Sequence, residues 1–178
     1  LFRSSSTAAD VAAAAKAAKK AGEDNATAAA LHDIGKMEIG EQVLNSPEPR
    51  TPEDEETMRQ HTLLGARMLE ELDAYRDEDF VRVAYQICRW HHERYDGSGY
   101  PDQLVGEQIP IAAQVVGLAD AYETLTTGSG SQPPVPCAAA VQMLCTGEAG
   151  AFNPVLLDCL REIENEIDDA MRRRPETL

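Results

Sequence analysis

Residues 91–101 read HHERYDGSGYP. Two adjacent histidines are followed by an acid, an arginine and a glycine-rich segment that ends in Tyr-Pro. A surface turn does not require two histidines side by side. Gly97 and Gly99 suit a loop with unusual backbone turns, and Tyr100-Pro101 stiffens the exit from that loop. The stretch therefore predicts a helix that ends at the two histidines and carries them toward a site.

The sequence on both sides of this stretch has mostly helical patterns. Thr51 is suited to cap a helix that starts with Pro52 and acidic residues. Apolar residues and one histidine then recur on a single stripe: Met58, His61, Leu64, Gly65, Met68, Leu69 and Leu72. Further helices are expected over residues 1–24, 25–36, 77–91, 110–125 and 137–145, and a last one begins at Asn153-Pro154 with Leu156, Leu160, Ile163 and Ile167 on its buried face. No strand pattern is found, so the predicted fold class is all-α.

Composition limits the classes of partner. The chain has 178 residues and a net charge of −15, which opposes binding to nucleic acid polymers and to anionic membranes. Its cysteines form no C-x-x-C pair and suit core positions in a reducing, cytoplasmic compartment; they are Cys88, Cys137, Cys145 and Cys159. No apolar run reaches membrane-spanning length. The chain begins without Met, so we expect a fragment of a longer protein with upstream domains.

The histidines form a small set with two acids. They are His32, His61, His91 and His92, while Asp33 follows His32 directly and Asp120 lies in an apolar helical segment. Taken singly, His61 is more simply a hydrogen-bonded core residue and Asp120 a residue at a bend or on the solvent side. Taken together, imidazoles and carboxylates without thiolates suit divalent iron, manganese or zinc. Mixed N/O sites with two metals hydrolyse phosphate esters.

Four segments in order resemble the HD-GYP family of metal-dependent phosphohydrolases. They are LHDIGK, MRQHTLLGARML, WHHERYDGSGYP and GEQIPIAAQVVGLADAYETLT. The resemblance extends over residues 25–127. The resemblance implies a helical bundle of the HD-domain type, with residues 1–24 as a truncated N-terminal helix and residues 128–178 as C-terminal helices of the same domain. It also implies two or three divalent ions, iron or manganese with zinc as the alternative. The implied ligands are His32, Asp33, His61, His91, His92 and Asp120.

The resemblance also implies a reaction. Phosphodiesterases of this type hydrolyse cyclic di-GMP to the linear dinucleotide or GMP in signal transduction, with metal-activated water as the nucleophile. Asp33 would bridge the metals, and Lys36 would bind the scissile phosphate, although without the motif Lys36 is more simply a helix-terminal cation. Gly99, Tyr100 and Pro101 would shape the site and contact partners, such as an upstream sensor or a GGDEF-type domain. Arg94 either meets the substrate or, as we favour, pairs within the loop.

Two departures from the family pattern bear on the substrate. The family has a further histidine ligand before the His-Asp pair, and here Thr7 stands in its place. The family also has a basic segment after the Asp120 helix, whereas Thr126 to Cys145 contains no Lys or Arg. The sequence therefore predicts poor handling of cyclic di-GMP. Two alternatives stay open: a different phosphoester substrate, or a degenerate, non-catalytic module that binds a nucleotide or a partner protein.

Overall fold

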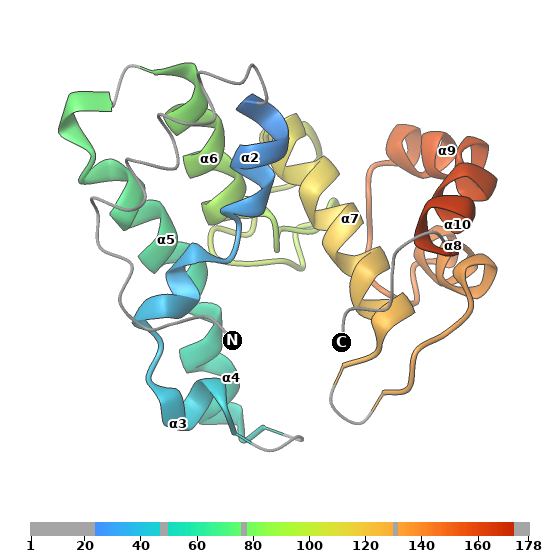
Figure 1. Cartoon of the computed structure of the whole chain (residues 1–178), viewed down its shortest axis with the longest axis horizontal. Helices are drawn as coiled ribbons and strands as arrows, with labels where there is room; N and C mark the ends of the chain where they lie inside the picture. Colours follow the sequence, from blue (N-terminus) through green and yellow to red (C-terminus); the bar gives the residue numbers. More distant parts are fainter. Residues whose placement is uncertain (1–23, 47–49, 76–77, 130–131, 173–178) are drawn as a thin grey trace. The chain divides into compact units, whose positions relative to one another are not determined.

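The computed structural model describes residues 24–46, 50–75, 78–129 and 132–172. Its α-helices and short 3-10 helices (η) are, in chain order, α2 (Asp24–Ala30), η1 (Ile34–Glu38), α3 (Glu41–Leu44), α4 (Pro52–Arg59), α5 (His61–Glu70), η2 (Asp73–Tyr75), α6 (Asp79–Trp90), η3 (Gly106–Gln108), α7 (Ile111–Thr127), α8 (Cys137–Thr146), α9 (Pro154–Glu162) and α10 (Glu164–Arg172) (Figure 1). These described ranges contain no β-strand, which confirms the all-α fold class. The helix expected before Asp24, with Thr7, lies outside the described residues. None of the described helices has the length and apolar character needed to cross a bilayer.

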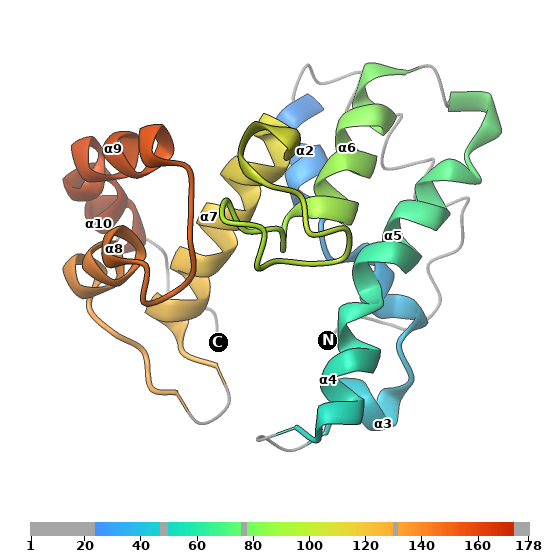
Figure 2. The ribbon, with the colours of Figure 1, turned by 180° about the vertical axis from the view of Figure 1, so that it is seen from behind.

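The chain divides into two compact units, Leu1–Gly117 and Leu118–Leu178, and the division falls inside α7. The first unit is held together where α5 packs against α6 and η1, and where α2 packs against α6 (Figure 2). Its buried core consists of Ala28, Met68, Leu69, Leu72, Phe80, Val81, Ala84, Ile87 and Cys88. The sequence-based boundary after residue 127 stays a prediction.

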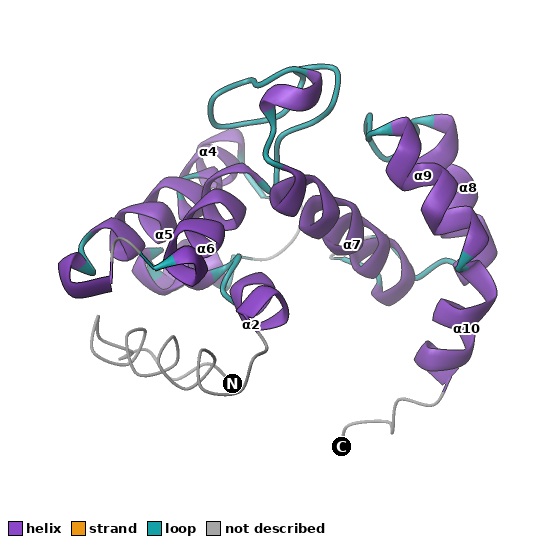
Figure 3. Ribbon diagram, turned by 90° about the horizontal axis from the view of Figure 1, so that it is seen from above, coloured by secondary structure: helices purple, strands orange, loops and turns teal. Residues whose placement is uncertain are grey.

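The second unit has a separate core. The later part of α7 contributes Leu118, Ala121 and Tyr122, and α8 contributes Ala140, Val141 and Leu144. Phe152 and Leu160 complete this core, and α8, α9 and α10 follow one another around it (Figure 3). The sequence predicts one last helix, but the structure has two, α9 and α10, which are separated at Ile163. The side chain of Ile163 is 43% exposed, so its expected burial is wrong, because the break changes the helical register at this residue.

The predicted start of the helix at residue 51 is confirmed. Thr51 Oγ1 accepts a hydrogen bond from the amide of Asp54 at 3.2 Å, and the Thr51 amide donates one to the Asp54 carboxylate at 3.4 Å. The helix is not continuous to Leu72, because α4 ends at Arg59 and α5 begins at His61. The side chains of His61 and Thr62 bind the carbonyl oxygens of Met58 and Arg59 at 2.7 and 3.0 Å. Such local bonds offer the backbone an alternative to a straight helix.

A second break lies at the His-Asp pair. The sequence predicts a helix over residues 25–36, but α2 ends at Ala30 and residues 31–33 form a turn before η1. The His32 ring donates to the carbonyl oxygen of Ala29 at 2.8 Å, which satisfies one of the carbonyls at the helix end. His32 and Asp33 therefore lie in the turn between α2 and η1 and not within a helix.

Candidate metal centre

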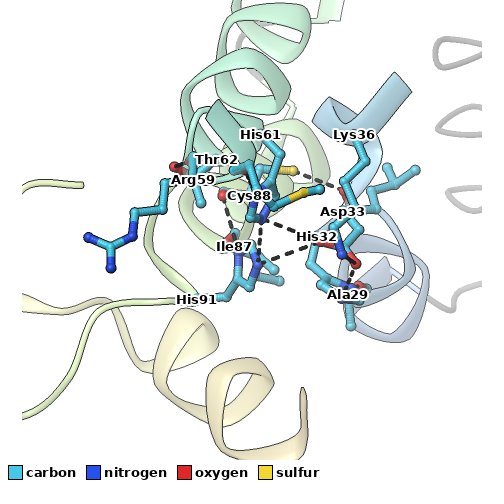
Figure 4. Close-up of polar contacts among 12 residues, drawn as sticks. Ala29, His32, Asp33, Lys36, Arg59, His61, Thr62, Ile87, Cys88 and His91 are labelled. Atoms are coloured by element: carbon cyan, nitrogen blue, oxygen red, sulfur yellow. Dashed lines mark hydrogen bonds and ion pairs between the residues drawn. The ribbon is translucent and has the colours of Figure 1, made fainter. Parts of the chain in front are cut away.

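Three histidines of the first unit are oriented by backbone carbonyls. Each Nδ1 atom bonds a carbonyl oxygen three or four residues earlier: His32 to Ala29 (2.8 Å), His61 to Met58 (2.7 Å) and His91 to Ile87 (2.8 Å) (Figure 4). Because a carbonyl oxygen only accepts, Nδ1 carries a proton in each ring, and whenever the ring is neutral Nε2 presents a lone pair. This is the arrangement by which proteins orient histidines that ligate metals.

The lone pairs of two of these rings meet a carboxylate oxygen. Asp33 Oδ1 lies 3.4 Å from His61 Nε2 and 4.0 Å from His91 Nε2, and the two Nε2 atoms are 3.3 Å apart. Asp33 Oδ1 is buried and accepts no hydrogen bond from the described residues. Three acceptors thus face one another with no proton to share between them, which is costly unless a cation binds there. The residues therefore fit a metal ion.

His92 brings a fourth donor to this cluster. One donor atom from each of Asp33, His61, His91 and His92 lies within 4.8 Å of all the others. The rings of His91 and His92 are adjacent, with centroids 4.1 Å apart. Nitrogen and oxygen donors without sulfur suit iron, manganese and zinc. The structure thus contains a His/Asp site that is suited to a metal ion.

The second oxygen of Asp33 faces a different pair of residues. Asp33 Oδ2 lies 3.3 Å from His32 Nε2 and accepts a hydrogen bond from Lys36 Nζ at 2.6 Å. His32 therefore lies on the Oδ2 side of the carboxylate, while His61 and His91 approach Oδ1. A carboxylate with donors around each oxygen is able to bind one cation at each.

Protonation states in the cluster also suit metal binding. Burial opposes the charge on Asp33, but hydrogen bonds and charge from His32 and Lys36 hold the pKa of Asp33 far below its usual range. Burial lowers the pKa of His61, and burial with the neighbouring histidines lowers the pKa of His91 to about 3. The pKa of His92 is lowered by the same causes. At neutral pH the cluster therefore offers a carboxylate and the neutral imidazoles of His61, His91 and His92, which are the forms that bind metals.

The loop after the histidines is tied to α6 by two acids. Glu93 is buried, and its carboxylate accepts hydrogen bonds from the amides of Asp102 (2.7 Å) and Leu104 (3.1 Å). Asp102 in turn accepts hydrogen bonds from Arg89 Nε and Trp90 Nε1, each at 2.7 Å. Sequence reasoning missed the role of Glu93, because its amide partners lie beyond the glycine-rich turn.

The loop brings Tyr100 onto the cluster. The rings of Tyr100 and His92 are stacked, with centroids 4.8 Å apart and an interplanar angle of 22°. Gly97 has a φ of +82°, as its predicted turn role requires. Gly99 is needed for a different reason: a Cβ there would stand 2.3 Å from the Arg94 amide nitrogen. Pro101, which follows Tyr100, lies in the segment that Glu93 fixes.

Two predicted site residues are not among these donors. Arg94 donates hydrogen bonds to the carbonyl oxygens of His91 (3.4 Å) and Glu93 (3.1 Å), so it caps the end of α6, and its contact with substrate stays a prediction. Asp120 lies on α7 in the second unit, so its place among the ligands also stays a prediction. The structure brings together His32, Asp33, His61, His91 and His92, all in the first unit.

Arg59 is a further neighbour of the cluster that sequence reasoning did not single out. Its guanidinium carbon lies 5.1 Å from the centroid of the Tyr100 ring, on the stack that ends at His92. Its position in the sequence could have identified it, because Arg59 lies two residues before His61, at the end of a helix that leads into the site.

Comparison with known proteins agrees with this geometry. Residues 2–155 match the family model described as "HD domain". The chain belongs to the HD-domain family. A Thermotoga maritima relative, "Cyclic di-GMP phosphodiesterase", is 34% identical over 82% of the chain and 39% of its own length. The Xanthomonas campestris "Cyclic di-GMP phosphodiesterase response regulator RpfG" is 37% identical over 75% of the chain and 34% of its own length.

A third relative differs in its named substrate. The Vibrio cholerae "3'3'-cGAMP-specific phosphodiesterase 2" is 30% identical over 76% of the chain and 25% of its own length. These relatives confirm the resemblance to the HD-GYP type that the ordered motifs indicate. The chain spans well under half the length of each of them.

Proposed function

We propose that this chain is the catalytic part of an HD-GYP-type phosphodiesterase that hydrolyses a cyclic dinucleotide. The observation that carries the proposal is the convergence of Asp33 Oδ1, His61 Nε2 and His91 Nε2, three acceptors at 3.3 to 4.0 Å with no hydrogen to share. The names of the relatives, which include cyclic di-GMP and cGAMP phosphodiesterases, support the same class of substrate.

The residues divide the work of such a reaction. His61, His91, His92 and Asp33 would hold one divalent ion, and His32 with Asp33 Oδ2 would hold a second, with Asp120 as a further ligand. Iron or manganese is the proposed metal, with zinc as the alternative. When bound, such ions supply a water of lowered pKa and neutralise phosphate charge. Hydrolysis forms a P–O bond from that water and breaks the bond to the 3′ oxygen, which takes up a proton.

Lys36 has a defined part in this proposal. Its ammonium group lies 2.6 Å from Asp33 Oδ2 and its side chain is 38% exposed, so it reaches both the carboxylate and a bound anion. We infer that Lys36 exchanges this carboxylate for a phosphoryl oxygen of the substrate and neutralises charge that develops there. An upstream sensor and a GGDEF-type domain are proposed as partners of the longer protein.

The test compares metal-loaded and chelator-treated protein with cyclic di-GMP, 3'3'-cGAMP and bis(p-nitrophenyl) phosphate as substrates. We expect hydrolysis only after loading with iron, manganese or zinc, with a linear dinucleotide or mononucleotides as products. Lys36→Met should keep its metal and lose turnover. Full metal loading without cleavage of any of the three esters would overturn the proposal.

A non-catalytic binding module is the second candidate. It is favoured by the absence of Lys and Arg from the segment Thr126 to Cys145, where the family has its basic residues. In that case calorimetry would find cyclic di-GMP bound by the metal-loaded protein, and chromatography would recover it uncleaved.

A further inference from the structure

A stack of three side chains leads from the metal cluster to solvent. The rings of His92 and Tyr100 are stacked, with centroids 4.8 Å apart. The guanidinium carbon of Arg59, at the end of α4, lies 5.1 Å from the centroid of the Tyr100 ring. His92 belongs to the cluster, whereas Arg59 is exposed. A guanidinium over an aromatic ring is held by cation–π attraction, so its orientation is restricted. The stack therefore places a positive charge beside the candidate site.

Arg59 differs from other arginines of the protein in its partner. Four of them form ion pairs with carboxylates: Arg67 with Glu38, Arg82 with Asp79, Arg89 with Asp102 and Arg161 with Asp158. Glu55 lies one helical turn before Arg59, at a spacing that favours an ion pair, yet within the described residues Arg59 contacts the Tyr100 ring and no carboxylate. In a chain with 31 acids and 16 Lys and Arg, the donors of this exposed guanidinium are thus available to a ligand.

The position of Arg59 complements that of Lys36. Figure 4 shows the two cations on opposite sides of His61 and His91. A cyclic dinucleotide carries two phosphodiester groups, and only one of them is at the metals during cleavage. The planar fork of arginine suits two parallel hydrogen bonds to phosphate, and Lys36 acts as a point charge.

We propose that Arg59, held on Tyr100, binds the phosphate of the cyclic dinucleotide that is not being cleaved. This inference rests on the proposed function and names the residue that recognises the second phosphate. Such a residue is needed because the sequence has no Lys or Arg between Arg94 and Arg161. That stretch includes the position of the family's basic segment. Arg94 is bound to backbone carbonyls, so Arg59 is better placed to replace that segment.

The test compares two esters in steady-state kinetics of the metal-loaded protein. Cyclic di-GMP has a second phosphate for Arg59, and bis(p-nitrophenyl) phosphate has a single one. Arg59→Gln should raise the KM for cyclic di-GMP by about tenfold or more, since a charge-assisted hydrogen bond is lost, and should raise the KM for the small ester much less. The KM of Arg59→Lys for cyclic di-GMP should fall between those of the wild type and of Arg59→Gln. Arg82→Gln, another exposed helical arginine, is the matched control and should change neither KM.

The outcomes separate the inference from its alternatives. If Arg59 only positions Tyr100 over His92, Arg59→Gln will lower kcat for both esters alike or release metal, and the inference is overturned. An unchanged KM for cyclic di-GMP overturns it as well. Wild-type protein that cleaves cyclic di-GMP or 3'3'-cGAMP with a KM that Arg59→Gln leaves unchanged overturns the inference alone, whereas cleavage of no ester overturns the proposed function with it.

Discussion

The two carboxylate oxygens of Asp33 face different histidines, and this separates Asp33 from every other member of the cluster. Oδ1 lies 3.4 Å from His61 Nε2, and Oδ2 lies 3.3 Å from His32 Nε2. A histidine whose Nδ1 is bound to a carbonyl has one donor atom left and serves a single ion. In the proposed two-metal site Asp33 is therefore placed to bridge the ions, and its loss would affect both.

We predict that Asp33→Ala loses more metal than His61→Ala. The carboxylate also supplies the negative charge that offsets the charge of the ions, which the histidines do not. The measurement is metal content per chain by elemental analysis after identical purification, with the exposed Asp158→Ala as the control for loss of an acid. Equal loss in the two variants, or greater loss in His61→Ala, would show that Asp33 does not bridge.

At the scale of elements, the site depends on close contact between η1 and α5. A Cβ at Gly35 would stand 2.0 Å from the carbonyl oxygen of His61 and 2.5 Å from the amide nitrogen of Gly65. Both are backbone atoms and cannot move as a flexible side chain would. Glycine at this position therefore lets the His-Asp turn approach the start of α5, where His61 begins the helix.

We predict that Gly35→Ala lowers the free energy of unfolding by about 1–3 kcal/mol or more, because it overpacks this contact, and that it also reduces metal content. Gly40→Ala is the matched control: at Gly40 the nearest atom to a Cβ is a flexible Gln42 side-chain atom at 3.5 Å. Its φ of −58° is accessible to alanine. Denaturant unfolding of the two variants checks the difference, and equal stabilities would contradict it.

The loop that carries Tyr100 is a second element of the site, and its attachment through Glu93 is testable. Glu93 is 5% exposed, and its carboxylate accepts hydrogen bonds from the amides of Asp102 and Leu104. We predict that Glu93→Ala costs about 1–3 kcal/mol, because two amides lose their acceptor. Hydrogen exchange at both amides should accelerate. Glu107→Ala, an exposed acid of the same segment, should leave exchange at these amides unchanged; faster exchange in both variants would reject a specific role for Glu93.

Local chemistry explains what the sequence predicted well. The helix start at Thr51 and Pro52 depends on residues next to one another, and the ordered motifs indicate the family and the all-α fold. The breaks at Gln60 and after Ala30 were missed because they depend on side-chain bonds to carbonyls and on the contact between Gly35 and the His61 carbonyl. Glu93 binds amides 9 and 11 residues away, a pairing that no periodicity contains.

Charge is the property that belongs to the whole molecule. The chain carries a net charge of −15, and its sequence has no Lys or Arg between Arg94 and Arg161. An anionic ligand is therefore repelled by the chain at long range and depends on the local charges at the site. Lys36, Arg94 and, by our inference, Arg59 are cations near the cluster, and all three belong to the first unit. Arg94 is bound to backbone carbonyl oxygens, so Lys36 and Arg59 are the two that we assign to the ligand.

We predict that this chain binds cyclic di-GMP more weakly than a family member that has the basic segment. Each charge-assisted hydrogen bond to phosphate that is absent weakens binding by about tenfold or more, and Arg59 replaces only part of the set. Calorimetric titration of the metal-loaded proteins at equal ionic strength measures the difference, because added salt screens the long-range repulsion of an acidic chain. Sub-micromolar binding with efficient cleavage would show that the metals, Lys36 and Arg59 suffice without a basic segment.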